Sequence, residues 1–438
     1  MTPRAPEVLP FPLRCLYGAA AALLWPFLYL YYRLRVRIDG KYAGNFRQRL
    51  GLDLPGRAPG RARPIWVHAL SVGETLSVVP LVEALKKERP EADILFSGAT
   101  AAGLEIARTR LAPWVETFFY LPHDFPWAVE LLVQRLKPGL FVLVETDLWP
   151  ALLDSLRRRG VATALVNARL SPGSFRRLSR LKPFFSTIVN GFDLVLAQSQ
   201  QDRLRFEALG VPANRCACEG NLKFDAAFVA AGRAGPSALR ISGGIEENRP
   251  VWIAGSTHAG EEEEVLSVHR ELLSVRPGLL LILAPRDIRR GPAVASLCDR
   301  FALPAALRSM KESARGKAVY LLDTMGELGA FYAVADAAFI GGSLVPFGGH
   351  NPLEAVVRGV PAVWGPHLFN FREMEDALLN DSCCRRIASR EELLDVLKSL
   401  LKNRDESREG KEAMPAFLRP HLGAGERIAR LLARLAAR

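Results

Sequence analysis

The sequence predicts an α/β protein of two doubly wound, Rossmann-like domains, each with a parallel sheet covered by helices on both faces. The chain has 438 residues, about three times what one domain usually needs. Short, continuous apolar runs alternate with helical segments, which is typical of strands buried on both faces of a parallel sheet. Polar and glycine-rich clusters directly follow several runs, at the strand ends where such folds place their binding loops.

The apolar runs assign the strands and the domain limits. In the first half they include Ile65–Val67, Ile94–Phe96, Leu140–Val144, Ala164–Val166 and Leu194–Ala197. In the second half they include Val251–Ala254, Leu279–Leu283, Val319–Leu322, Ala337–Ile340 and Ala362–Trp364. Residues 229–250, rich in Ala, Gly and Arg, favour a linker. We therefore expect domains at 39–230 and 245–425, and a closing amphipathic helix at 426–438.

Composition limits the class of protein and its partners. With 49% hydrophobic and 24% charged residues, the chain is neither disordered, collagen-like nor a polytopic membrane protein. Lys plus Arg number 58 and Asp plus Glu 46, so the net charge is +12, which indicates an anionic partner such as nucleic acid, anionic lipid or small phosphorylated or carboxylated molecules. The six cysteines lack zinc-site spacing and are predicted to be reduced thiols.

The N-terminus predicts a membrane anchor over residues 1–38. Residues 15–32 carry no charge, close to the lower limit for a bilayer span, and are followed by Arg33, Arg35, Arg37 and Lys41. The positive-inside bias then places the remainder in the cytosol. A cleaved signal peptide and an amphipathic helix lying on the membrane are the alternatives, and Pro26 favours the second over a full span.

Acidic residues follow two strands of the first half. Glu74, in His68-Ala-Leu-Ser-Val-Gly-Glu74, falls near a helix start, where the positive helix end is expected to keep it ionised. An ionised carboxylate can accept a proton from an attacking hydroxyl, although Glu74 can equally be a helix-start residue only. Glu145 and Asp147, in ETDLWP, can coordinate a metal, place a substrate or cap the next helix.

Basic residues and glycines supply the candidate anion contacts. Arg169 follows a predicted strand of the first half. Lys223 is a single cation near the end of the first half. In the second half, small and hydroxyl residues of 254–263 open a helix, and Arg286 is placed for a bidentate phosphate contact. Four glycines between 341 and 349 let the backbone approach a phosphate, and Glu354 is the residue type that accepts hydrogen bonds from ribose hydroxyls.

Several familiar chemistries lack their motifs. There is no G-x-x-x-x-G-K-[ST], G-x-G-x-x-G, H-E-x-x-H or G-x-S-x-G, and no catalytic-cysteine context. Nothing interleaves aromatic and basic residues as nucleic-acid binding would require. Two sheets, an anion-binding second half and a carboxylate base in the first half indicate group transfer from a nucleotide. This is the GT-B arrangement of glycosyltransferases, in which two Rossmann-like domains face a cleft.

Nine motifs in order resemble the Kdo transferase family, whose members add 3-deoxy-D-manno-octulosonic acid (Kdo) to a lipid A precursor. They are SVGE, ETDLWP, NARLS, GNLKFD, AGSTH-x-GEEE, APR, DTMGEL, GGSLVPFGGHNPLE and GPHLFNF. The resemblance implies a CMP-Kdo donor, a lipid A precursor as acceptor and action at the cytoplasmic face of the bacterial inner membrane. Because CMP leaves as a single phosphate ester, cationic side chains and amides could neutralise it, and we expect no cofactor and no metal ion.

The resemblance also assigns roles to residues. Glu74 matches the general base, and Glu145 and Lys223 match the residues that stabilise the transition state. The positions that match the CMP-binding residues are Pro285, Arg286, Met325, Gly326, Glu327, Asn351, Pro352, Leu353 and Glu354. We add further candidate neighbours of the donor: Ser256, Thr257, Ser343, Gly348 and Gly349.

The chain departs from the family pattern at four places. Asp287 stands where His commonly follows Pro-Arg, Asp147 replaces Glu, Ala151 replaces Asn, and Ala355 replaces Pro. By the resemblance, we expect the change at Asp287 to bear on one donor contact, and those at Asp147 and Ala151 to bear on the acceptor pocket. Two rival functions remain: another nucleotide-sugar enzyme of this fold, such as a UDP-sugar transferase or epimerase, and a membrane-tethered binding protein without catalysis.

Overall fold

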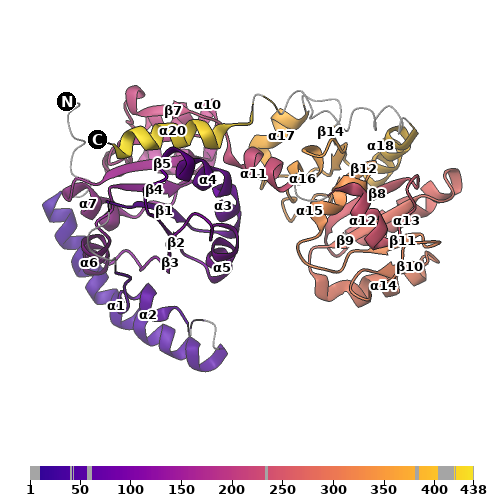
Figure 1. Cartoon of the computed structure of the whole chain (residues 1–438), viewed down its shortest axis with the longest axis horizontal. Helices are drawn as coiled ribbons and strands as arrows, with labels where there is room; N and C mark the ends of the chain where they lie inside the picture. The colour runs from indigo at the N-terminus through magenta and orange to yellow at the C-terminus, as the bar shows by residue number, and fades with distance from the viewer. Residues whose placement is uncertain are drawn as a thin grey trace. The chain divides into compact units, whose positions relative to one another are not determined.

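The computed structural model of the chain describes residues 10–39, 42, 44–56, 62–231, 235–379, 384–402, 419 and 421–437 (Figure 1). Lys41 and residues 1–9 of the predicted anchor lie outside these ranges. The chain divides into two units, one of Met1–Ala226 with His421–Arg438 and one of Ala227–Pro420. Each unit is built on one seven-stranded sheet whose strand pairs are all parallel, so the predicted fold class is confirmed.

The sheet of the first unit has the order β3-β2-β1-β4-β5-β6-β7. Its strands are β1 Ile65–Ala69, β2 Ile94–Gly98, β3 Thr117–Tyr120, β4 Leu140–Val144, β5 Ala162–Ala168, β6 Leu194–Ala197 and β7 Cys216–Cys218. The helices before β4 are α1 Phe11–Asp39, α2 Phe46–Arg49, α3 Val72–Ser77, α4 Val79–Glu88, α5 Ala101–Arg110 and α6 Pro126–Leu136. Those after it are α7 Pro150–Arg158, α8 Pro172–Arg180, α9 Lys182–Val189, α10 Gln200–Ala208, η1 Ala213–Arg215 and α11 Leu222–Ala231.

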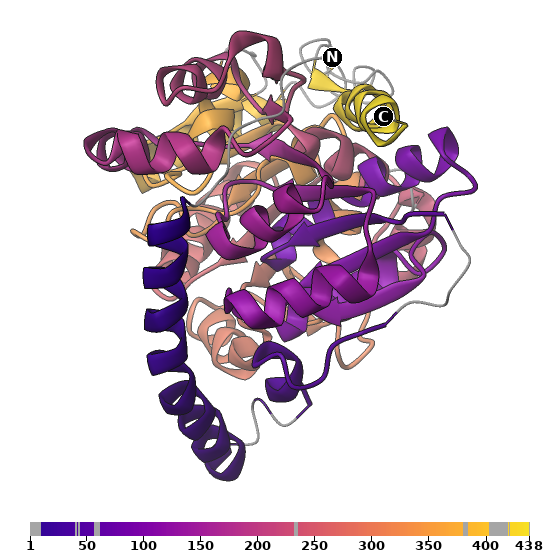
Figure 2. The same cartoon turned by 90° about the vertical axis from the view of Figure 1, so that its left-hand side faces the viewer.

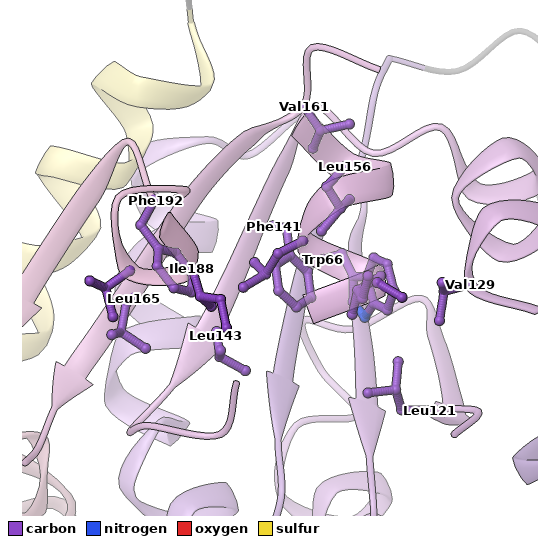
Figure 3. Packing of buried hydrophobic residues seen from close by; sticks show 14 of the residues in the cluster. Trp66, Leu121, Val129, Phe141, Leu143, Leu156, Val161, Leu165, Ile188 and Phe192 are labelled. Atoms are coloured by element: carbon purple, nitrogen blue, oxygen red, sulfur yellow. The ribbon is translucent and has the colours of Figure 1, made fainter. Parts of the chain in front are cut away.

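Both faces of this sheet are covered by apolar side chains. Along β1, Trp66 points into one core layer, whereas Ile65 and Val67 point into the other, as the two-residue period of a strand requires. Figure 3 shows the first layer, in which Trp66 and Phe141 lie near Leu156. The strands are therefore held from both sides, and their carboxyl ends are fixed in place.

The second unit repeats this design with the order β10-β11-β9-β8-β12-β13-β14. Its strands are β8 Val251–Thr257, β9 Leu280–Pro285, β10 Ala305–Leu307, β11 Val319–Leu321, β12 Ala337–Ile340, β13 Ala362–Trp364 and β14 Cys384–Arg386. Its helices up to β10 are α12 Pro236–Gly243, α13 Glu261–Val275, η2 Ile288–Arg290 and α14 Gly291–Arg300. The later ones are α15 Leu328–Phe331, η3 Tyr332–Val334, α16 Leu353–Val356, α17 Arg372–Leu379 and α18 Arg390–Lys402.

The segment predicted as a linker contains part of the second unit. Within 229–250 the chain forms α12, and Arg240 of that helix is buried and donates hydrogen bonds to the Glu246 and Val334 carbonyls. Gly244 ends the helix at φ +64°, a left-handed conformation that suits glycine. The second unit thus begins before the predicted residue 245.

The closing helix belongs to the first unit rather than to the second. This helix, α20 Ala424–Ala436, packs on α4 and contributes Ile428 and Leu432 to the second core layer of the first sheet. Asp225 fixes its start by accepting hydrogen bonds from the amides of Gly423 and Gly425 at 2.7 and 2.6 Å. The predicted range 245–425 therefore ends slightly too late, because the chain returns to the first unit at residue 421.

Candidate active site

Glu74 lies at the start of α3, directly after the carboxyl end of β1. The hydroxyl of Ser71 accepts a hydrogen bond from the Glu74 amide and donates one to Glu74 Oε1 at 3.0 Å. Glu74 Oε2 accepts a hydrogen bond from the Leu70 amide at 2.6 Å. This reciprocal arrangement resembles a capping box, and it holds the carboxylate in one orientation.

The surroundings of Glu74 differ from the sequence-based expectation. The side chain is only 8% exposed, and burial is the main cause that raises its pKa above the usual value. The negative charges of Glu145 and Asp147 raise this pKa further, while the Leu70 and Ser71 hydrogen bonds oppose the rise. The expectation that the positive helix end keeps Glu74 ionised did not include burial, which acts in the opposite direction. A raised pKa brings a carboxylate closer to the range suited to a general base.

Glu145 and Lys223 form an ion pair in the same unit. Lys223 Nζ lies 2.9 Å from Glu145 Oε1, and the two side chains are 25% and 20% exposed. Glu145 has φ +61°, a left-handed conformation that costs a non-glycine residue roughly 1–3 kcal/mol. Such strain concentrates at functional sites, and here the strained residue is the one that pairs with Lys223. The structure thus joins two residues that lie 78 positions apart.

The rest of the strand-end loops supports this pair. Asn167, at φ +52°, accepts a hydrogen bond from the Leu222 amide at 3.0 Å and so places the start of α11. Asp147 accepts a hydrogen bond from the Trp149 indole at 2.9 Å, and burial raises the pKa of Asp147. The Arg169 backbone carbonyl and amide both bond to the Thr146 hydroxyl. Among the described residues, no group of three His, Cys, Asp or Glu side chains could hold a metal ion.

In the second unit, the glycine-rich loop after β12 binds an anion supplied by the chain itself. The fully buried Glu261 accepts hydrogen bonds from the amides of Gly342, Ser343 and Leu344 at 2.7–3.0 Å, and from the His258 amide at 2.9 Å. This corrects the expectation that the loop and the start of α13 are open to a phosphate. Their donors are occupied by a carboxylate that sequence analysis did not single out.

Several added donor-side candidates are packing groups. The Ser343 hydroxyl is fully buried, donates to the Ile340 carbonyl and accepts from the Gly365 amide at 2.8 Å. Thr257 is also fully buried. A side chain at Gly348 would meet Asn370 at 2.5 Å, so this glycine allows the loop to pack on residues 369–370. Gly349, at φ +72°, donates its amide to the Gly342 carbonyl.

The remaining predicted donor-side residues differ in exposure and in partners. Arg286 is exposed at the end of β9, and its charge partly offsets the burial that raises the pKa of Glu354. Ser256, near the carboxyl end of β8, has the left-handed backbone angle φ +57°. Pro285 ends β9, and Pro352 and Leu353 are buried at the start of α16, where the Asn351 side chain accepts a hydrogen bond from the Leu353 amide. Asp287 pairs with Arg289, and the hydrogen bond from Arg289 lowers the pKa of Asp287.

Arg308 is a partner of the predicted CMP-binding segment that sequence analysis missed. Its guanidinium binds Glu327, with Nη2 to Oε1 at 2.7 Å and Nε to Oε2 at 3.2 Å, and this pairing lowers the pKa of Glu327. Gly326, at φ +81°, makes the turn, and Met325 beside it is 68% exposed. Arg308 follows the edge strand β10, which was not predicted, so no sequence signal placed it here.

Two histidines from separate loops also meet in this unit. His258 Nε2 and His350 Nε2 are 2.9 Å apart, their rings are stacked, and His258 also stacks on Phe347. Burial is the main cause that lowers the pKa of His350 to about 4, and the charge of Arg286 lowers it further. Lowered pKa values favour the neutral form of both rings, in which one Nε2 can donate a hydrogen bond that the other accepts.

The fold and the loops at the strand ends define the class of protein. Two doubly wound units with acidic, basic and glycine-rich clusters at their strand ends form a GT-B architecture. A UDP-GlcNAc 2-epimerase from Neisseria meningitidis has the same fold, with a TM-score of 0.61 and 10% identity over 85% of this chain and 99% of its own.

Sequence relatives narrow the class to one family. The family described as 3-deoxy-D-manno-octulosonic-acid transferase (kdotransferase) matches residues 44–226. The 3-deoxy-D-manno-octulosonic acid transferase of Haemophilus influenzae is 35% identical over 79% of this chain and 80% of its own length. That of Bordetella pertussis is 33% identical over 93% of this chain and 95% of its own. The chain therefore belongs to the Kdo transferase family and is a glycosyltransferase.

Proposed function

We propose that this enzyme transfers Kdo from CMP-Kdo to a lipid A precursor, lipid IVA, at the cytoplasmic face of the bacterial inner membrane, in lipopolysaccharide core biosynthesis. The observation that carries the proposal is the Glu74 carboxylate, oriented by two hydrogen bonds at the end of β1, with a pKa raised by burial. The names of the relatives supply the transferred sugar, and the basic surplus of the chain suits an anionic donor and acceptor.

The reaction is a direct displacement at the anomeric carbon of Kdo. The acceptor hydroxyl oxygen forms the new glycosidic bond while the bond from the anomeric carbon to the phosphate oxygen breaks and CMP leaves. Glu74 takes the hydroxyl proton, a contribution worth about 10²–10⁴ in rate. Its fixed orientation avoids reorganisation of the base during the step.

Charged groups balance the negative charge that moves onto the leaving phosphate. We assign Lys223 and Glu145 to transition-state stabilisation, because their ion pair holds the ammonium group near the end of β4. On the donor side we assign Arg286 to the phosphate and Glu354 to the ribose hydroxyls. Met325, Gly326 and the Glu327 held by Arg308 provide the remaining contacts to CMP. The proposed mechanism requires no metal ion.

Radiolabelled donors test the assignment directly. Purified full-length protein is incubated with lipid IVA and either labelled CMP-Kdo or labelled UDP-sugars, and the lipid product is counted and weighed by mass spectrometry. We expect label to move only from CMP-Kdo. Transfer only from a UDP-sugar, or epimerisation of one, would reject the proposal in favour of another enzyme of this fold. Tight lipid binding without any transfer would favour a non-catalytic protein.

A further inference from the structure

Helix α1 is attached to the first unit along one of its faces. Side chains at helical spacing, from Arg14 to Tyr32, pack on α2, α6 and α7, and Figures 1 and 2 both show α1 along the edge of this unit. The polar contacts along this face are Arg14 Nε to Asp154 Oδ2 at 2.9 Å, Tyr17 Oη to Asp124 Oδ2 at 2.9 Å, Trp25 Nε1 to the Leu50 carbonyl at 3.3 Å, and Tyr32 Oη to His123 Nε2 at 2.8 Å.

The opposite face of α1 is apolar and exposed. Between residues 15 and 32 the helix carries no charged side chain. Its exposed large side chains in this stretch are Leu16, Leu23, Leu24, Phe27, Leu30 and Tyr31, each at least 47% exposed. A helix that faces water on a soluble domain carries polar side chains on that face. This face therefore requires an apolar partner.

The contacts on the attached face of α1 argue against a helix that crosses the bilayer. The segment Phe11–Ile38 is long and apolar enough to cross a bilayer, with a mean hydropathy of 1.4. However, the contacts from Arg14 to Tyr32 cover about 27 Å of helix, nearly the full thickness of the hydrocarbon core. A crossing α1 would carry Asp124, Asp154 and His123 into lipid, or would break every contact that holds it.

We propose that α1 is a monotopic helix that lies parallel to the membrane, with its exposed apolar face in the acyl boundary of one leaflet and the folded unit on its other side. The occupant of the face is a bilayer with anionic head groups. The exposed Arg33, Arg37 and Arg47 at the C-terminal end of the helix and in α2 provide the complementary charge. The inference rests on the membrane location in the proposed function, and it places both ends of α1 on the same side.

Depth measurements distinguish a helix in the plane from a crossing helix. A nitroxide label is attached at Leu16, Leu23, Phe27 or Leu34, one per variant, in the full-length chain with its native cysteines replaced by alanine. The protein is reconstituted in vesicles of phosphatidylethanolamine and phosphatidylglycerol. We expect all four labels at a similar shallow depth, about 5–10 Å below the head groups. Labels 23 and 27 near the midplane, with 16 and 34 in opposite leaflets, would overturn the inference, as would four labels in water.

A charge substitution on the lipid face provides a second measurement that does not depend on labelling. The double variant Leu23→Lys, Phe27→Lys should lower binding to the same vesicles by at least about 100-fold, since it removes two buried apolar side chains and places two charges in the acyl boundary. Leu204→Lys in α10, a matched exposed leucine of the same unit, should leave binding unchanged. Equal losses in both would contradict the inference. Neither assay reads Kdo transfer, so an inactive chain with equal label depths would reject the proposed function alone.

Discussion

The two units each place a Gly-Glu pair after the first strand of a parallel sheet, yet they use the glutamate differently. Glu74 follows Gly73 after the first strand of one sheet, and Glu261 follows Gly260 after the first strand of the other. Glu261 accepts four backbone amides and is completely buried. Glu74 accepts one amide and one hydroxyl, and it is 8% exposed. One carboxylate is a structural anion, whereas the other keeps lone pairs available for a proton.

The neighbouring strand explains this difference. The loop after β12 offers a row of amides because Gly342 adopts φ +69°, and Glu261 fills it. The loop after β4 is the topological counterpart, but there Glu145 adopts φ +61° and pairs with Lys223. A second negative charge beside Glu74 raises its pKa instead of binding it. The comparison teaches that the loop after the neighbouring strand decides whether a glutamate in this motif is a structural anion or a candidate base.

The largest expected effect comes from breaking the reactive member of the pair. Glu74→Gln should lower Kdo transfer by about 10²–10⁴, because an amide cannot accept the proton. Its unfolding free energy should change by less than about 1 kcal/mol, since the capping geometry is kept. Both are measured on the full-length protein, by transfer kinetics and by denaturant unfolding.

A nearby carboxylate serves as the control for this variant. Glu83→Gln in α4 removes an exposed ion pair with Lys87 and should leave transfer unchanged. Retention of more than a tenth of the wild-type rate in Glu74→Gln would assign the proton to another group.

Substitution of Glu261, the structural glutamate, should lower the stability of the second unit. Glu261→Gln places an NH₂ group against backbone donors and weakens charge-assisted hydrogen bonds, so we expect the second unit to lose roughly 3 kcal/mol of stability. Glu263→Gln, two residues on and exposed, should lose less than about 0.5 kcal/mol. Thermal unfolding of both variants measures the difference, and equal melting temperatures would contradict the assigned role of Glu261.

A buried tryptophan and histidine extend the comparison and predict acid sensitivity. Trp66 and Trp252 hold the second position of β1 and β8, and their indoles bond to Ser97, a partner of His68, and to His269 directly. Burial lowers the pKa of each histidine from 6.5 to about 4.

The sign of the pH effect follows from these lowered values. Both histidines are neutral in the folded and unfolded chain above pH 6.5, so their protonation does not lower the free energy of unfolding there. Between pH 6.5 and 4 only the unfolded chain binds the protons, and about 3 kcal/mol is lost per histidine. Urea unfolding against pH measures this loss. His68→Gln and His269→Gln should each lower the slope of unfolding free energy against pH by the equivalent of one proton, each in its own unit. An unchanged slope in both variants would contradict the assigned role of the histidines.

The smallest expected effect concerns the arginine that sequence analysis missed. Arg308→Lys replaces a two-point contact with Glu327 by a point charge on a partly exposed pair. We expect the KM for CMP-Kdo to rise about fivefold with little change in kcat, whereas Arg289→Lys, which alters a similar exposed pair with Asp287, should change neither. A fall in kcat at constant KM would give Arg308 a different role.

Sheet position decided which strands could be predicted from sequence. The ten runs identified from apolar character are the interior strands of the two sheets. The four strands that escaped, β3, β7, β10 and β14, are the sheet edges. An interior strand is buried on both faces and must be apolar throughout, whereas Cys216–Cys218 and Cys384–Arg386 are short and partly exposed.

The candidate site could be predicted in its positions but not in its partners. The prediction placed Glu74, Glu145 and Lys223 near strand ends, and the structure brings Glu145 and Lys223 together. The occupation of the glycine loop by Glu261 depends on contacts between residues 81 positions apart, which no local sequence pattern records. The direction of the Glu74 pKa depends on burial by the finished fold, which the helix-end argument could not include.

The acidic limb of the transfer rate tests the role of Glu74 most directly. In single-turnover reactions at saturating CMP-Kdo, the rate should fall on acidification with a midpoint above the usual carboxyl value, because burial raises the pKa of Glu74. Glu145→Gln removes a neighbouring negative charge and should move the midpoint to lower pH. Ser71→Ala removes a hydrogen bond to the carboxylate and should move it to higher pH. Midpoints that stay at the wild-type value in both variants would show that the proton goes to a different group.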